Sequence, residues 1–329
     1  MLKKIKRAFK RNNEEATGYE AIKSKLHPRI RPASFFEVYE MSAWELADDS
    51  SSCDLFFAEY DSDLAIGAVL LDKNGSKAIS MADIDDWNID PNIIIEKSLD
   101  DFLDLLPNET FEEARQGLWI STLKNMNDST LLYAKDLIKS LDIKGLPVAF
   151  IPNRDVLLIT GSEDQENLSF LIEETSSFIQ EHGAISGQPY ILKGDSWHKF
   201  SLNNTHSCSF ILKQLIYQNK KAFYSQFSEY AQPENITIQD FEFQVDDSTK
   251  TIFSYTIWKN NGISWFPKTD YIVIAPGDSD NKIKIEDFKN RLFPWDIVME
   301  FFKEQAHKLD SYNEYWEINA DPTNFRVNK

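Results

Sequence analysis

Apolar residues recur along this chain at two spacings, one typical of helices and one typical of strands. Helical spacing predicts a mainly helical region over 19–46, interrupted at Pro28 and Pro32, and further helices over 128–141, 162–182 and 206–230. It also predicts a helix over 83–106 that is broken or kinked near Asp90-Pro91, and a helix over 285–309 with a kink at Pro294. Short apolar or alternating runs predict strands over 54–60, 64–71, 77–81, 118–122, 189–192, 236–245, 251–258, 263–266 and 270–275. Helices and strands mixed in this order predict an α+β fold.

Two turns stand out within this pattern. The block 146–159 predicts two short strands joined by a turn at Pro152 and Asn153. Asn261-Gly262 stands between the strand-like runs 251–258 and 263–266, and this dipeptide is a strong hairpin signal. The sequence therefore predicts a hairpin at each of these turns, besides a plausible hairpin loop at Asp61-Ser62-Asp63 and a further turn at Asn74-Gly75.

The composition of the sequence changes near residue 203, where a long predicted helix is followed by strand-like runs rich in aromatic residues. A chain of 329 residues also exceeds the usual size of one domain. We therefore expect a basic leader over 1–18, a mixed domain over 19–202 and a second mixed domain over 203–329. In the second domain, helices are expected to pack on a mainly antiparallel sheet.

The charge of the chain narrows the classes of partner. A net charge of −18 repels phosphate backbones, which disfavours nucleic-acid binding, and it suits association with a basic protein. Cys53 and Cys208 lie far apart and form no disulfide framework, which fits a reducing cytoplasm. No apolar run approaches the roughly 20 residues that span a bilayer, so integral membrane association is not expected.

The basic leader has the opposite charge to the rest of the chain. Its basic residues are Lys3, Lys4, Lys6, Arg7, Lys10 and Arg11. If the segment is helical, Leu2, Ile5, Ala8 and Phe9 share one face, which would permit weak contact with a membrane surface. The favoured alternative is a solvated leader that its charge holds near the acidic body, since so short a helix is marginal in water.

Three groups of residues could carry chemistry, and each has a structural explanation that we favour. Asn153, Arg154 and Asp155 could present charge at a sheet end, but they are also typical turn residues. His198, His206 and Cys208 lack the spacing of a nucleophile and its base. The cluster Asp83, Asp85, Asp86 and Asp90 lacks the glycine and glutamate of a calcium loop and fits helix capping. We predict no catalytic, cofactor or metal residues.

Aromatic residues are frequent in the C-terminal strands. Trp265, Tyr271 and Trp316 could line an exposed patch that recognises another protein. The alternation also fits a covered sheet, and because Trp258 and Phe266 fall on the opposite face, both faces read as apolar. A core role is favoured over a patch, and both remain open.

The region from about residue 54 to 200 resembles an uncharacterised bacterial family of YtpQ-like domains. The resemblance rests on the order of elements, from the helix that begins near Trp87 and ends on Leu106-Pro107 to the segment Pro152-x-x-Asp155-Val156-Leu157-Leu158-Ile159 and the approach Gly187-Gln188-Pro189. This family has no assigned reaction, so the resemblance implies a mixed fold and no catalytic residues. It covers less than half of the chain.

These observations favour a non-enzymatic cytoplasmic protein that binds a basic protein through its acidic surface, as an adaptor or an immunity-type inhibitor. One alternative is a hydrolase that uses carboxylates and His198. Another is a peripheral membrane protein held by the basic leader.

Overall fold

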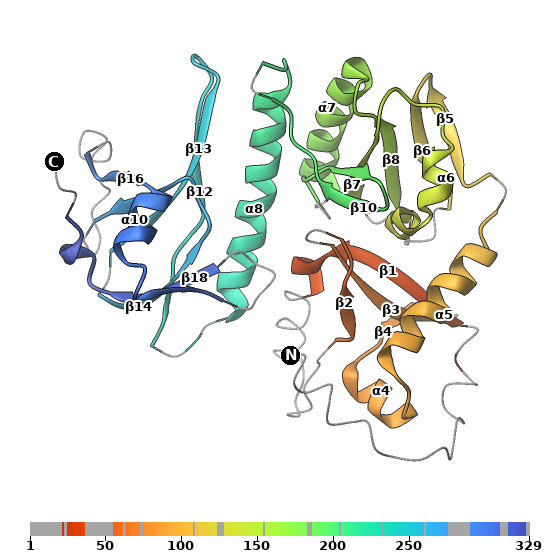
Figure 1. Cartoon of the computed structure of the whole chain (residues 1–329), viewed down its shortest axis with the longest axis horizontal. Coiled ribbons are helices and arrows are strands. Elements are labelled where there is room, and N and C mark those ends of the chain that lie inside the picture. Colours follow the sequence, from red (N-terminus) through yellow and green to blue (C-terminus); the bar gives the residue numbers. More distant parts are fainter. Residues whose placement is uncertain are drawn as a thin grey trace.

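The computed structural model has an α+β fold, as predicted (Figure 1). The structure describes residues 22, 25–36, 55–61, 64–72, 75–107, 109–123, 128–153, 155–182, 186–203, 205–231, 233, 235–259, 261–275, 290–309 and 315–326. The basic leader, Cys53 and Arg154 lie outside these residues. None of the described helices is both long and apolar enough to cross a membrane.

The first sheet has four strands in the order β1-β3-β2, with β4 also paired to β3. Its strands are β1 (Leu26–Pro32), β2 (Phe57–Glu59), β3 (Leu64–Asp72) and β4 (Gly75–Ala78). Two helices follow it, α4 (Met81–Trp87) and α5 (Pro91–Asp104). Helix α5 lies on β1 and β3 and buries Ile94, Leu99 and Phe102 against the sheet.

The second sheet has six strands in the order β10-β9-β7-β8-β6-β5, and all its pairings are antiparallel. Its strands are β5 (Phe111–Arg115), β6 (Leu118–Ser121), β7 (Pro147–Asn153), β8 (Val156–Gly161), β9 (Tyr190–Lys193) and β10 (Ser196–Lys199). One face packs on the 3-10 helix η2 (Asp128–Tyr133) and on α6 (Lys135–Lys139). The other face packs on α7 (Gln165–His182).

The C-terminal part contains two four-stranded sheets, β11-β14-β18-β17 and β12-β13-β15-β16. Their elements are β11 (Thr237–Ile238), β12 (Glu242–Asp246), β13 (Thr251–Trp258), β14 (Gly262–Pro267), β15 (Tyr271–Ile274), β16 (Leu292–Pro294), α10 (Trp295–Phe301), β17 (Ala306–Lys308), β18 (Tyr315–Ala320) and η3 (Pro322–Asn324). The pairs β11–β14 and β13–β15 are parallel and the other four are antiparallel. The expectation of a mainly antiparallel arrangement therefore holds for two sheets instead of one.

Helix α8 (Ser209–Ala231) stands between the six-stranded sheet and the C-terminal sheets (Figure 1). One side of α8, including Leu212, packs with α7 and the six-stranded sheet. Its other side presents Tyr217, Tyr224 and Phe227 to the C-terminal strands. The Tyr217 hydroxyl donates to Asp270 Oδ2 at 2.6 Å, and both burial and this carboxylate raise the pKa of Tyr217. The boundary expected near residue 203 falls just before a helix that both cores share.

Strand β1 is closed on its outer side by hydroxyl groups from η2. Thr130 Oγ1 accepts from Ile30 N at 3.3 Å and donates to Pro28 O at 3.2 Å, and Ser129 Oγ donates to Ile30 O at 2.8 Å. The buried guanidinium of Arg31 also donates to Ile30 O and to Ser129 Oγ. Buried backbone groups need partners, so η2 acts as a substitute for a neighbouring strand.

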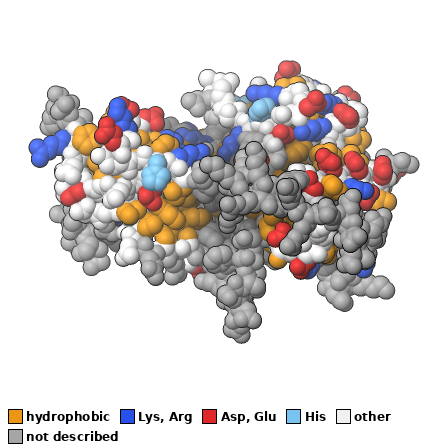
Figure 2. Space-filling model, turned by 60° about the horizontal axis from the view of Figure 1, so that its bottom comes forward, with side chains coloured by type: hydrophobic (Ala, Val, Ile, Leu, Met, Phe, Trp, Pro, Cys, Tyr) orange, Lys and Arg blue, Asp and Glu red, His pale blue; other side chains and the backbone are white. Residues whose placement is uncertain are grey.

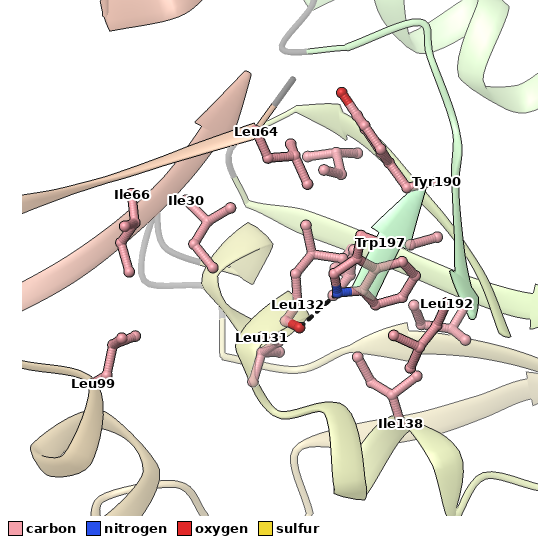
Figure 3. Close-up of a cluster of buried hydrophobic side chains, with 14 of the residues drawn as sticks. Ile30, Leu64, Ile66, Leu99, Leu131, Leu132, Ile138, Tyr190, Leu192 and Trp197 are labelled. Carbon is pink, nitrogen blue, oxygen red and sulfur yellow. Dashed lines mark hydrogen bonds between the residues drawn. The ribbon is translucent and has the colours of Figure 1, made fainter. Parts of the chain in front are cut away.

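A second junction joins the first sheet to the β9–β10 hairpin. Asp61 Oδ2 accepts from Lys135 Nζ at 2.8 Å and from Trp197 N at 2.9 Å. The Trp197 indole is fully buried, and its Nε1 donates to Leu132 O at 2.8 Å (Figure 3). Leu64 of the first sheet and Leu192 of the second belong to the same buried cluster. The first two sheets therefore share one core.

Four sequence-based predictions of secondary structure are wrong. The single strand predicted over 236–245 divides into β11 and β12, which belong to different sheets. Residues 26–32 form strand β1, not a helix, because residues before Pro28 and Pro32 are pushed out of the helical region. The region 128–141 divides into η2 and α6. In the region 285–309 the described part, from residue 290, holds β16, the short helix α10 and β17, because Pro294 precedes α10 as its N-cap instead of kinking a longer helix.

The hairpin predicted at Asn261-Gly262 is also wrong. Strand β13 pairs with β12 and β15, whereas β14 pairs with β11 and β18. The chain turns a corner at Gly262, whose φ of 109° favours glycine, and then enters the other sheet. Trp258 and Phe266 meet edge to face at 5.2 Å in the core between the two sheets. Two separate sheets thus cover the strands that read as apolar on both faces.

We expect Asp61→Asn to lower the free energy of unfolding by about 1–3 kcal/mol, because the Lys135 ammonium would lose its charged partner. Urea denaturation of the full chain measures this change. Asp142→Asn is the matched control, since Asp142 is exposed, and it should stay within about 0.5 kcal/mol of wild type. Equal effects of both substitutions would show that the junction adds no stability.

Candidate functional site

The residues predicted at the end of the β7–β8 hairpin form a turn. Asn153 Oδ1 accepts from Asp155 N at 2.8 Å, which is the geometry of an Asx turn. Arg154 lies outside the described residues, so the charged pair expected there has no described geometry. The prediction of two strands joined by a turn is confirmed.

The histidine and cysteine candidates lie apart from one another or serve the fold. His198 is exposed on β10. His206 Nδ1 accepts from the backbone N–H of Cys208 at 3.1 Å, just before α8 begins. The Cys208 thiol is buried and lies 3.0 Å from Ser169 Oγ. The imidazole of His206 therefore contacts the backbone of Cys208 and does not act on its thiol. Among the described residues, no group of three or more His, Cys, Asp or Glu side chains could hold a metal ion.

The three aromatic residues predicted for the core or for a patch lie between the core and the surface. Trp265, Tyr271 and Trp316 are all half-buried. Trp265 Nε1 donates to Glu317 Oε2 at 2.8 Å, Tyr271 packs edge to face on Phe253, and Trp316 packs on Trp295 in the C-terminal core. These side chains serve mainly as the outer layer of the two sheets.

A cavity of about 20 Å³ lies in the first sheet, lined by Arg29, Phe35, Phe36, Leu55, Phe56, Ala68, Val69, Ala78 and Ile79. This volume holds about one water molecule. Most of the lining side chains are apolar. A substrate site needs far more room, and neither His198 nor Asp155 belongs to this lining.

One of the two most acidic stretches of the chain covers α4, α5 and β5. Within residues 81–115 the sequence has eleven acidic residues and two basic ones, which accounts for half of the net charge. Two of these carboxylates serve the fold as helix caps. Asp83 completes a capping box with Ser80, and Asp90 caps α5 through Asn92 N at 2.9 Å. Partial burial opposes ionisation of Asp83, but Lys77 and Ser80 hold its pKa below the usual range.

The remaining carboxylates of α5 are not explained by capping. Glu96, Asp100 and Asp104 are exposed and follow each other at four-residue intervals, so they form one column on the side of α5 opposite its buried residues. Like charges at this spacing destabilise a helix by a few tenths of a kcal/mol per pair. None of the three forms an ion pair with a residue that the structure describes.

The end of α5 adds a second electrostatic cost. Asp101 and Asp104 lie in its last turn, which contains no basic residue. The C-terminus of a helix carries partial negative charge and favours cations there. The three carboxylates of the column repel one another, and Asp104 also opposes the helix dipole. A cation bound at this face would offset both costs.

Apolar side chains are exposed on the same side of α5. Ile93 is 41% exposed and Leu103 is 39% exposed, and Leu105, which follows the helix, is 75% exposed. Acidic side chains form a row on the side of the molecule that carries α5 (Figure 2). We call Ile93, Glu96, Asp100, Leu103 and Asp104 the acidic face of α5. Lys97 is the single basic residue of α5 and also points outward.

Sequence reasoning recognised the capping aspartates and missed the acidic face. The signal that could have found it was the four-residue spacing of Glu96, Asp100 and Asp104 in a helix whose buried positions were already predicted.

No protein-family model, curated protein or solved structure matches this chain. The resemblance to the YtpQ-like family therefore stays a prediction.

His27 of β1 interacts electrostatically with Asp101 of α5, away from the acidic face. Burial lowers the pKa of its imidazole, and the carboxylate of Asp101 opposes this shift less strongly. Because the folded pKa lies below that of the unfolded chain, which is near 6.5, stability contributed by neutral His27 is lost as the pH falls below 6.5. We expect His27→Gln to lose less stability than wild type between pH 7.5 and 5.5 in urea denaturation. An unchanged slope in His27→Gln would refute the assignment.

We expect Asp104→Lys to raise the free energy of unfolding by about 1 kcal/mol, because it turns repulsion from Asp100 into attraction and complements the helix dipole. Asp104→Asn, which only removes the repulsion, should give about half of this gain. Thermal and urea denaturation measure both variants. A loss of stability in Asp104→Lys would mean that the carboxylate contributes to the fold.

Proposed function

We propose that this chain is a non-enzymatic protein-binding protein whose acidic face of α5 docks a basic partner, as an adaptor or inhibitor. The observation that carries the proposal is the column Glu96, Asp100 and Asp104, which costs stability and has no ion-pair partner among the described residues. A bound cationic surface would relieve the repulsion within the column.

The mixed composition of the face favours a protein over a small cation. The exposed Ile93 and Leu103 flank the carboxylates on the same side of the helix. Carboxylates steer a basic partner and fix its register, while exposed apolar side chains supply area that is removed from water. An amphipathic basic segment of a protein has both features.

The hydrolase alternative has less support. Its discriminating feature is a concave pocket that holds His198 or Asp155 beside a second acid. His198 is exposed on the short strand β10, and Asp155 lies in the turn after β7.

The test compares two charge reversals of equal size. Asp100→Lys/Asp104→Lys changes the acidic face, and Glu173→Lys/Glu174→Lys changes exposed residues of α7 by the same net charge. The probe is an eight-residue oligolysine, titrated by fluorescence anisotropy at about 20 mM and 200 mM salt. We expect the α5 variant to bind it at least tenfold more weakly at low salt and the α7 variant to bind within about twofold of wild type.

The same three proteins serve as baits in a capture from host lysate. A basic protein that wild type and the α7 variant retain, and the α5 variant does not, would be the partner that the proposal requires. Equal loss in both variants would show that binding follows net charge alone, and that outcome would overturn the proposal.

A further inference from the structure

We propose that the acidic face of α5 is occupied in the free protein by the chain's own basic segment, residues 3–11, which a basic partner must displace. This inference rests on the proposed function, because both use the same face.

Charge complementarity favours this occupant. Residues 1–11 contain six basic residues and no acidic one, on a chain of net charge −18. The acidic face presents three carboxylates without ion-pair partners among the described residues. Residues 81–115 contain eleven acidic residues and two basic ones, and residues 37–71 contain nine acidic residues and no basic one, so net charge alone does not distinguish these two stretches.

The apolar residues of the two partners also complement each other. The basic segment intersperses Ile5 and Phe9 among its cations. The acidic face exposes Ile93 and Leu103 between its carboxylates. Contact between these side chains would remove apolar surface from water, which charge attraction to any other acidic region of the chain would not do.

The path of the chain brings the segment within reach. Ile22, the first residue that the structure describes, packs against the cluster that contains Ile84 of α4 and Ile94 of α5. The eleven residues from Arg11 to Ile22 span up to about 36 Å when extended. Helix α5 has 14 residues and is about 21 Å long. Basic residues 3–11 can therefore reach the whole acidic face from their anchor.

A tethered segment competes efficiently with a separate partner. A tether of about eleven residues gives an effective concentration on the order of 1 mM, so even a weak intramolecular contact is substantially formed. The apparent affinity for a basic partner is then the intrinsic affinity multiplied by the fraction of molecules whose acidic face is free. Replacement of the six basic residues by Gln should therefore strengthen oligolysine binding by about threefold or more.

Zero-length carbodiimide crosslinking of the full-length protein tests the contact directly, because it joins a Lys amine to a carboxylate in contact. At about 1 µM protein and low salt, we expect crosslinks from Lys3, Lys4, Lys6 or Lys10 to the α5 carboxylates, identified by mass spectrometry. They should disappear in Asp100→Lys/Asp104→Lys and at about 0.5 M salt, and persist in Glu173→Lys/Glu174→Lys. A mixture of isotope-labelled and unlabelled protein shows whether they form within one chain.

Three results would overturn the inference. They are crosslinks from the basic segment mainly to carboxylates outside α5, crosslinks mainly between labelled and unlabelled chains, and no crosslinks from it at all. Binding of wild type to vesicles with 30% phosphatidylserine, unchanged by the α5 reversal, would assign the segment to a membrane surface instead.

The outcomes separate this inference from the proposed function. If oligolysine binds the acidic face and the basic segment fails to crosslink to it, the face awaits another partner and only the intramolecular contact is refuted. If the variant with six Gln residues fails to bind oligolysine through α5, the proposed function itself fails.

Discussion

The structure depends on the need to satisfy buried backbone groups where two sheets meet without a shared strand. Strand β1 has no second neighbouring strand among the described elements, and its outer side faces the second unit of the fold. The hydroxyls of Ser129 and Thr130 supply the missing hydrogen bonds, and the buried Arg31 closes the junction. An unpaired carbonyl there would cost roughly 1–3 kcal/mol, so the 3-10 helix η2 is fixed in place by what it must satisfy. Its Leu131 and Leu132 then enter the shared core.

Helix α8 joins the six-stranded sheet to the C-terminal sheets by side-chain packing on both of its sides. One side of α8 carries apolar side chains such as that of Leu212, and the other side carries the aromatic side chains of Tyr217, Tyr224 and Phe227. Tyr224 and Phe227 pack on the fully buried Tyr315 of β18, which brings the end of the described chain against the middle of it. Helices buried on both sides have little freedom to turn, so α8 holds the register between the six-stranded sheet and the C-terminal strands.

How much of this could be predicted from sequence depends on whether a signal is local. The strand 251–258 was predicted with its observed bounds, because alternation between Ile252 and Trp258 is a local pattern. The partner of a strand is not local, and so Asn261-Gly262 indicated a hairpin where the chain instead changes sheets. Strand β1 was missed because its pairing with β3 and its hydrogen bonds to η2 join residues far apart in sequence. The turn at Asn153 was found because Asn and Pro act on their nearest neighbours.

The carboxylates on the acidic face of α5 differ from others in the same region in whether the fold supplies them with a partner. Some carboxylates of this region have partners that the fold requires: Asp83 has Ser80 and Lys77, and Asp90 has Asn92. Glu96, Asp100 and Asp104 have no ion-pair partner among the described residues and repel one another, and Asp104 also lies in the last turn, where the helix dipole disfavours negative charge. The buried side of α5 is fixed by the sheet beneath it, so the helix cannot rotate to relieve this repulsion. Relief must come from a positive charge that is brought to the face from elsewhere, and this requirement connects the stability of α5 to the binding that we propose.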